Sequence, residues 1–192
     1  MKKVLLISFW IIFFFITSDA GIATNRSGGV KYYASMRLFL VQHGNVLPKD
    51  EELERGLSES GKQDVENVAA FLARGSIQAE RIYHSGKKRA WETADLFKVC
   101  LIGDGHFDER DGIAPLDPVV DVAEEIQNLS KDTMFVGHLP FVGKLVAHLI
   151  AGNENIGVVS FTPGTVVCLE RDGNDIWSVA WVVRPELLKS LN

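Results

Sequence analysis

Short apolar runs alternate with segments of helical periodicity along most of this 192-residue chain. Three of the runs, at residues 38–41, 81–83 and 133–136, have the length and composition of strands in a buried parallel sheet. Each is followed by a segment in which apolar side chains recur at helical spacing. This alternation predicts repeated strand–helix units.

The helical segments are recognised by one apolar face each and by residues suited to helix ends. Four helices are predicted: one after Ser58 with Val65, Val68, Ala69 and Leu72 inward; one marked by Ala90, Ala94 and Phe97; one over residues 119–129; and one from Pro140 to Gly152 with Val142, Leu145, Val146 and Leu149 inward. The stretch between the second and third helices, through Asp117-Pro118, is predicted to be a loop.

The C-terminal part has a different pattern. Residues 165–169 and 176–183 are predicted strands, and Asp172-Gly173-Asn174 between them is a strong signal for a hairpin turn. The whole pattern predicts an α/β fold: a three-layer sandwich with a mostly parallel central sheet, helices on both faces and an antiparallel C-terminal hairpin.

The N-terminal residues interrupt this organisation. Two lysines precede a 13-residue apolar run at positions 4–16, and small residues follow, as in a secretory signal peptide. The run is shorter than the ~20 residues that a membrane-spanning helix needs. Met36 directly precedes the first strand and is an alternative start of translation. The chain is therefore divided into three parts: residues 1–20, a signal peptide, an anchor or an untranslated segment; residues 21–35, a linker; and residues 36–192, the folded domain.

Charge and cysteine content narrow the function further. The chain has 20 Lys+Arg against 25 Asp+Glu, a net charge of −5, and residues 36–192 alone carry −8. Such an acidic domain argues against nucleic acid or an anionic membrane as the main partner.

Cys100 and Cys168 lie far apart without a CxxC motif, which predicts two buried thiols and neither a disulfide framework nor a zinc site.

Polar side chains follow the predicted parallel strands directly. His43, His84-Ser85 and His138 each stand just after a strand, and Arg55 and Arg89 lie in the segments that follow the first two. The carboxyl ends of parallel strands meet at one edge of a sheet, so we expect these side chains to converge there. The planar guanidinium group matches phosphate oxygens, which predicts a phosphate site. No HxH or HExxH motif accompanies the histidines, so no metal or other cofactor is expected.

The motifs around these residues, taken in order, resemble the histidine phosphatase superfamily (phosphoglycerate mutase-like). Their details are similar to its small SixA branch, the phosphohistidine phosphatases. The resemblance covers about residues 36–184. The motifs that carry it are LFLVQHG at 38–44, RGLS at 55–58, SGKKRAWETA at 85–94 and VGHLPF at 136–141.

This resemblance implies a role for each site residue. It makes His43 the nucleophile, which attacks phosphorus and forms a phosphohistidine that water then hydrolyses. It makes Arg89 and His138 catalytic groups that also bind phosphate, and it adds Arg55 and Ser85 to the phosphate site. Their role is to stabilise the charge spread over the phosphoryl oxygens during transfer.

Two features depart from the larger superfamily. Gln42 stands where most members have Arg; its amide still binds phosphate, but a lost charge-assisted contact costs about 1.5–3 kcal/mol if nothing replaces it. No general acid stands out, since Glu109 and Asp111 lie in a mid-chain run typical of solvated surface. An imidazole leaving group needs less help from an acid than an alcohol does. The lack of an evident general acid therefore favours phosphohistidine as the substrate.

The sequence thus predicts a metal-independent phosphatase that works through phospho-His43 on a phosphohistidine-containing phosphotransfer protein. It is expected to be a monomer whose catalytic domain contacts no membrane. A cytoplasmic location is expected from the signalling role, with export as the alternative if residues 1–20 act as a signal peptide. Two alternative functions remain: a phosphomonoesterase acting on a small ester, and a non-catalytic phosphate-binding module, for which Gln42 is the motivating feature.

Overall fold

The computed structural model describes residues 22–24, 30–32, 36–48 and 54–189. Its main sheet consists of β3 (Met36–Gln42), β4 (Ala79–His84), β5 (Leu101–Glu109), β6 (Thr133–Gly137), β7 (Val166–Arg171) and β8 (Trp177–Val183). The strand order is β5-β4-β6-β3-β7-β8. The first four strands in this order run parallel, whereas β7 is antiparallel to β3 and β8 is antiparallel to β7.

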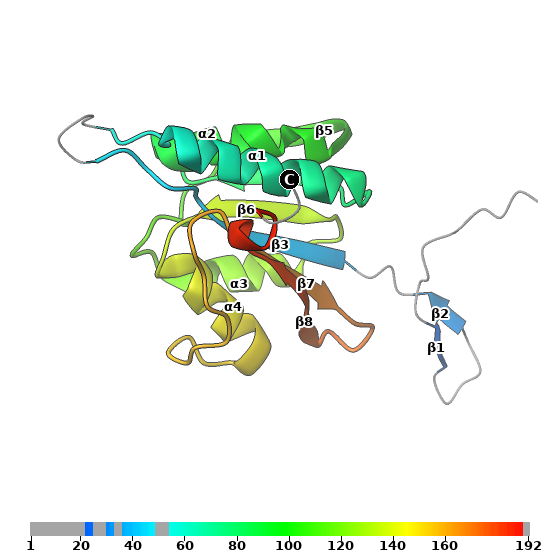
Figure 1. Cartoon of the computed structure of the whole chain (residues 1–192). Coiled ribbons are helices and arrows are strands. Elements are labelled where there is room, and N and C mark those ends of the chain that lie inside the picture. The colour runs from blue at the N-terminus through cyan, green and yellow to red at the C-terminus, as the bar shows by residue number, and fades with distance from the viewer. Residues whose placement is uncertain (1–21, 25–29, 33–35, 49–53, 190–192) are drawn as a thin grey trace, which may run out of the picture.

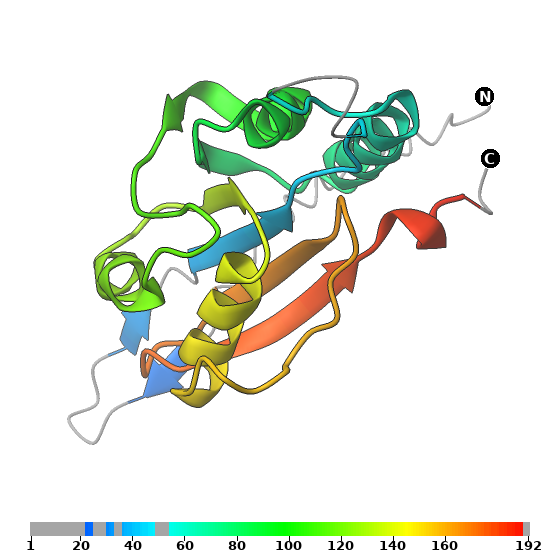
Figure 2. The ribbon, with the colours of Figure 1, turned by 90° about the vertical axis from the view of Figure 1, so that its left-hand side faces the viewer.

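Helices cover both faces of this sheet (Figures 1 and 2). On one face lie α1 (Glu59–Arg74), α2 (Lys88–Leu96) and two short 3₁₀ helices, η1 (Phe97–Cys100) and η2 (Pro185–Leu187). On the other face lie α3 (Val119–Gln127) and α4 (Phe141–Ala151). The predicted three-layer α/β sandwich with its C-terminal hairpin is therefore confirmed.

The central strand β3 shows how one apolar run serves two cores. Phe39 and Val41 are buried in the core beneath α1 and α2. Leu38 and Leu40 are buried in the core beneath α3 and α4. Successive side chains of a strand point to opposite faces, so a strand covered on both sides must be apolar at every position.

The predicted helices and their inner faces are also confirmed. The four residues predicted to face inward from α1 are all buried, and Ser58 caps that helix. In the last predicted helix, α4 ends at Gly152, which has a left-handed φ of 64° and donates its N–H to the carbonyl of His148. The turn at residues 172–176 joins β7 to β8, as the Asp-Gly-Asn signal predicts.

Two predictions about irregular segments were wrong or incomplete. Residues 101–109, predicted to be part of a loop, form the edge strand β5. This strand pairs on one side only and carries no fully buried side chain, so its sequence lacks a continuous apolar run. Within the predicted linker, β1 (Ile22–Thr24) and β2 (Val30–Tyr32) form a short antiparallel pair. The predicted signal peptide, residues 1–20, lies outside the described residues.

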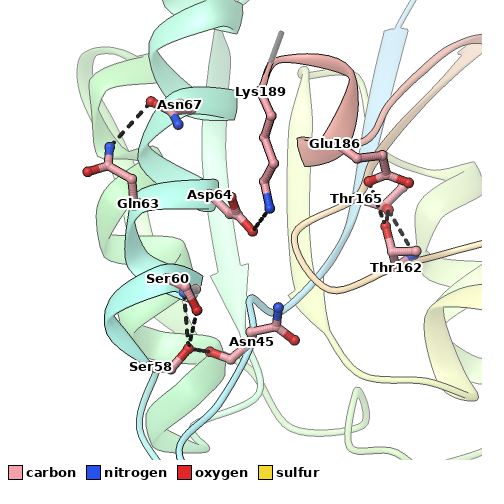
Figure 3. A network of polar contacts seen from close by, with 11 residues as sticks. Asn45, Ser58, Ser60, Gln63, Asp64, Asn67, Thr162, Thr165, Glu186 and Lys189 are labelled. Atoms are coloured by element: carbon pink, nitrogen blue, oxygen red, sulfur yellow. Dashed lines mark hydrogen bonds and ion pairs between the residues drawn. The ribbon is translucent and has the colours of Figure 1, made fainter. Parts of the chain in front are cut away.

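Polar contacts connect the beginning of α1 to neighbouring segments (Figure 3). The Ser58 hydroxyl accepts a hydrogen bond from the Gly61 N–H at 3.1 Å, which caps the helix. One turn further on, Asp64 pairs with Lys189 of the C-terminal segment at 3.0 Å. In the described part of the chain, no helix has both the length and the apolar character needed to cross a membrane.

Both cysteines are buried free thiols, as predicted. They lie in the core beneath α1 and α2. Burial raises the pKa of Cys100 to about 11 and that of Cys168 to about 12. Both side chains therefore act as small apolar groups.

Gly61 in the first turn of α1 provides a test of the packing around the loop that follows β3. A Cβ atom at this position would lie 2.2 Å from the carbonyl oxygen of Asn45. We expect Gly61→Ala to lower the free energy of unfolding by ~1–3 kcal/mol through overpacking, although Ala is ordinarily favoured over Gly in helices by ~1 kcal/mol. Denaturant unfolding measures the effect. Gly157→Ala, where a Cβ atom meets open space, is the matched control; equal stability of the two variants would contradict the expectation.

Candidate active site

Three adjacent parallel strands deliver the predicted site residues to one edge of the sheet. The strands β4, β6 and β3 are neighbours, and Ser85, His138 and His43 follow them directly. The backbone N–H of His43 donates to the carbonyl of Gly137 at 3.0 Å, which extends the β3–β6 pairing by one residue. The position of His43 is therefore set by the sheet itself.

The two ring nitrogens of His43 have different partners. Nδ1 lies 2.8 Å from the carbonyl oxygen of Gly44. Nε2 lies 3.2 Å from Nε of Arg89. A carbonyl oxygen can only accept and a guanidinium nitrogen can only donate. Nδ1 therefore carries the proton, and Nε2 presents its lone pair.

The second histidine lies beside the first. The rings of His43 and His138 have centroids 5.0 Å apart. Nε2 of His138 shares a hydrogen bond of 2.6 Å with the hydroxyl of Ser85, and the side chain of His138 is almost completely buried, with 1% exposure. The structure thus brings together His43, Ser85, Arg89 and His138, which the sequence predicted from their positions after strands and at the start of a helix.

Burial keeps both imidazoles neutral. Burial is the main cause that lowers the pKa of His43 to about 4. The hydrogen bond that His43 donates to the Gly44 carbonyl raises this pKa, whereas the charges of Arg89 and Arg55 lower it further. Burial also lowers the pKa of His138 to about 3, with contributions from His43, Arg89 and Lys87. At neutral pH the positive charge of the site therefore resides on its arginines and lysines.

Arg55 reaches the site from a strained loop. It has a φ of 37°, a left-handed conformation that a non-glycine residue adopts at a cost of about 1–2 kcal/mol. Hydrogen bonds of 3.0 Å join Arg55 Nε to the Leu47 carbonyl and the Leu47 N–H to the Gly56 carbonyl. Glu92 of α2 also accepts the N–H of Leu57. These contacts hold Arg55 near Arg89. Burial lowers the pKa of Arg89, and the positive charge of Arg55 lowers it further.

A polar cleft of about 310 Å³ opens beside these residues. Its walls come from the strained loop and from the beginning of α2: Glu54, Arg55, Gly86, Lys87, Lys88 and Arg89. Cationic side chains predominate, so the cleft is suited to an anionic ligand. Within the described ranges, no group of three or more His, Cys, Asp or Glu residues is arranged to hold a metal ion.

Gln42 lies at the site without a charge of its own. It is the last residue of β3, is 8% exposed, and its amide oxygen is buried without a hydrogen-bond partner in the described residues. Its backbone is fixed by hydrogen bonds to Thr165 and from Gly164. Gln42 thus supplies a polar amide, but no cation, next to His43.

Glu109 lies in a different setting from the one predicted. It is the final residue of the edge strand β5 and not part of a loop, because residues 101–109 pair with β4. Its carboxylate is close enough to Gly86 that a Cβ atom there would meet it at 2.1 Å. Glu109 and Asp111 are both exposed, in agreement with the solvated surface that their acidic run predicts.

Thr93 is a positioning residue that was not among the predicted site residues. Its hydroxyl accepts the N–H of Gly44 at 3.0 Å and donates to the carbonyl of Arg89 at 2.7 Å. The side chain therefore connects the backbone beside the candidate nucleophile to the helix that carries Arg89. The available signal was its spacing, since Thr93 lies four residues after Arg89 on a predicted helix and so faces the same side.

The chain is similar in sequence or in fold to several known phosphatases. The chain is 26% identical over 159 residues to the phosphohistidine phosphatase SixA of Escherichia coli K12, a match that covers 80% of this chain and 97% of that protein. A solved structure of the protein histidine phosphatase SixA, complexed with tungstate, is similar with a TM-score of 0.70 and 23% identity over 80% of this chain and 99% of that one. A phosphoserine phosphatase from Entamoeba histolytica has a TM-score of 0.59 and 14% identity, covering 77% and 96% of the two chains.

The fold is thus that of the phosphoglycerate mutase-like proteins. No protein-family model matches the chain. The sequence match and the shared fold together support a SixA-type histidine phosphatase, a hydrolase of the histidine phosphatase superfamily.

The contact between Thr93 and Gly44 can be tested by removing one hydroxyl group. Thr93→Val leaves the buried N–H of Gly44 without a partner, so we expect a loss of ~1–3 kcal/mol in the free energy of unfolding. We also expect a lower kcat/KM on phosphoramidate, because the segment beside His43 is no longer held to α2. Thr93→Ser keeps the hydroxyl and serves as the control; identical behaviour of the two variants would argue against this positioning role.

The neutrality of the two histidines can be observed directly by NMR. We expect the ring nitrogens of His43 and His138 to remain in the neutral state at pH 5.5, because both pKa values lie well below the ordinary value of about 6.5. Arg89→Leu removes a neighbouring cation and should raise the pKa of His43. Between pH 6.5 and 4 the unfolded chain binds protons that the native state does not, so stability should fall as the pH is lowered. Titration of His43 near pH 6.5 would contradict this picture.

Proposed function

We propose that the protein is a metal-independent phosphatase that works through a phospho-His43 intermediate and removes phosphate from phosphohistidine in a signalling phosphotransfer protein. The observation that carries the proposal is the tautomer of His43. Its Nε2 is unprotonated and lies against Arg89, beside the cationic cleft. A nucleophile needs this lone pair, and an incoming phosphoryl group needs the cations.

In the first step, Nε2 of His43 forms a bond to phosphorus while the bond from phosphorus to the leaving nitrogen breaks. The leaving imidazole retains the electron pair of that bond and takes up a proton. The phosphorylated ring of His43 becomes cationic, and its Nδ1–H donates to the Gly44 carbonyl, which stabilises that charge. In the second step, water attacks the same phosphorus, inorganic phosphate leaves, and Nε2 regains its lone pair.

The surrounding groups stabilise the phosphoryl oxygens during both transfers. Arg89 donates to Nε2 before the reaction, and this N–H becomes available to phosphoryl oxygens once Nε2 is bonded to phosphorus. Arg55 adds a second guanidinium to the lining of the cleft. His138, neutral and hydrogen-bonded to Ser85, contributes a hydrogen-bonding group without adding charge.

Two considerations support phosphohistidine over a phosphate ester as the substrate. An imidazole leaving group is readily protonated near neutral pH, so it depends little on a general acid from the enzyme. The E. coli relative is itself named a phosphohistidine phosphatase. A structural neighbour is a phosphoserine phosphatase, which keeps the phosphomonoesterase alternative in view. The uncharged Gln42 is the reason to keep the second alternative, a phosphate-binding module without catalytic activity.

The proposal is tested with the full chain and a histidine phosphotransfer domain labelled with radioactive phosphate. We expect release of inorganic phosphate and a transient, acid-labile label on the enzyme. His43→Ala should abolish the label and lower kcat/KM by at least about 10³-fold, since the nucleophile is lost. His106→Ala, which changes an exposed histidine of β5, is the matched control and should behave as the wild type.

Each alternative gives a different result in the same assay. A phosphomonoesterase would turn over p-nitrophenyl phosphate with a higher kcat/KM than the labelled domain. A phosphate-binding module would bind inorganic phosphate or tungstate without forming a labelled enzyme. Undiminished turnover by His43→Ala would overturn the proposed mechanism.

A further inference from the structure

The cleft beside His43 carries more positive charge than the phosphoryl site alone accounts for. Four of its lining side chains are cationic, Arg55, Lys87, Lys88 and Arg89, against the lining carboxylate of Glu54. The exposed carboxylate of Glu109 lies beside Gly86 at the edge of the cleft. The chain as a whole has a net charge of −5. This local concentration of cations is therefore a specific feature of the site and does not follow from the overall composition.

The cations of the cleft lie at different depths. Arg89 contacts the His43 ring, so it belongs to the inner end. Lys88 is half-buried, and its side chain lies with that of Glu92 against Gly56. Lys87 is exposed and stands at the mouth. Its backbone is fixed nevertheless, because its carbonyl accepts the first hydrogen bonds of α2.

An exposed apolar residue occupies the same edge of the sheet. Leu139 directly follows His138 and is 42% exposed. A partner protein that covers this edge would bury Leu139, whereas a small substrate would leave it exposed. The carboxylate of Glu54 in the cleft wall disfavours a second dianionic group of a small substrate.

We propose that the mouth of this cleft binds acidic side chains that flank the phosphorylated residue of a partner protein, with Lys87 as the principal contact. The inference rests on the proposed function and adds to it the surface chemistry of the substrate. Arg55 and Arg89 take the phosphoryl group, and Lys87 pairs with carboxylates of the surrounding protein surface. A charge at the rim of an interface acts mainly on association rate and salt dependence.

The test measures the activity of the full chain on two substrates of different size: a phosphorylated histidine phosphotransfer domain and phosphoramidate. For Lys87→Glu we expect the loss in kcat/KM on the protein substrate to exceed the loss on phosphoramidate by at least ~10-fold. The loss should appear mainly in KM, and the salt dependence of kcat/KM on the protein substrate should become weaker. Lys131→Glu is the control, since it makes the same charge change beside Glu80 at the opposite end of β4.

Equal losses on the two substrates would overturn the inference and place Lys87 in the phosphoryl pocket; no loss on either would also overturn it. A second measurement keeps the inference separate from the proposed function. NMR titration of the full chain with a hexaglutamate peptide should shift the resonances of Gly86 and Lys87, with weaker binding in Lys87→Glu. If neither substrate is turned over, the proposed function fails while this titration still decides the inference, and the absence of peptide binding overturns it.

Discussion

The arrangement of this site depends on one hydrogen bond, from Nδ1 of His43 to the carbonyl oxygen of the next residue, Gly44. A carbonyl oxygen cannot donate, so the proton of the imidazole is confined to Nδ1 and the lone pair to Nε2. The guanidinium of Arg89 then has an acceptor to bind, and the lone pair of the candidate nucleophile has a defined direction. With the opposite tautomer, Nε2 of this histidine would carry the proton and point an N–H at the cations. The hydrogen bonds to the Gly44 carbonyl and from Arg89 could then not form.

That hydrogen bond is one link in a closed path of contacts. Gly44 donates its own N–H to Thr93, Thr93 donates to the carbonyl of Arg89, and the side chain of Arg89 returns to His43. The candidate nucleophile and its neighbouring cation therefore share one support, and neither can shift without disturbing the other. Burial of this unit and the cations around it both keep His43 neutral. Preorganised charge around a neutral nucleophile is the arrangement that phosphoryl transfer requires.

The sequence was informative wherever a residue's role follows from its position in a regular element. His43 and His138 were placed correctly because each ends an apolar run, and runs buried on both faces are easy to recognise. The strand β5 was missed because an edge strand is paired on one side and needs no apolar run. For the same reason, the sequence pattern predicts a loop around Glu109. The contacts of Thr93 depend on how α2 packs against the segment after β3, which is tertiary information that local pattern does not contain.

The two buried thiols have a consequence for where this domain can operate. A thiol reacts as its thiolate, and burial keeps Cys100 and Cys168 protonated as well as inaccessible. Neither forms a disulfide, so the fold does not require an oxidising environment, and neither is reactive, so such an environment does not endanger it. The native state of this domain therefore depends on neither cysteine being oxidised.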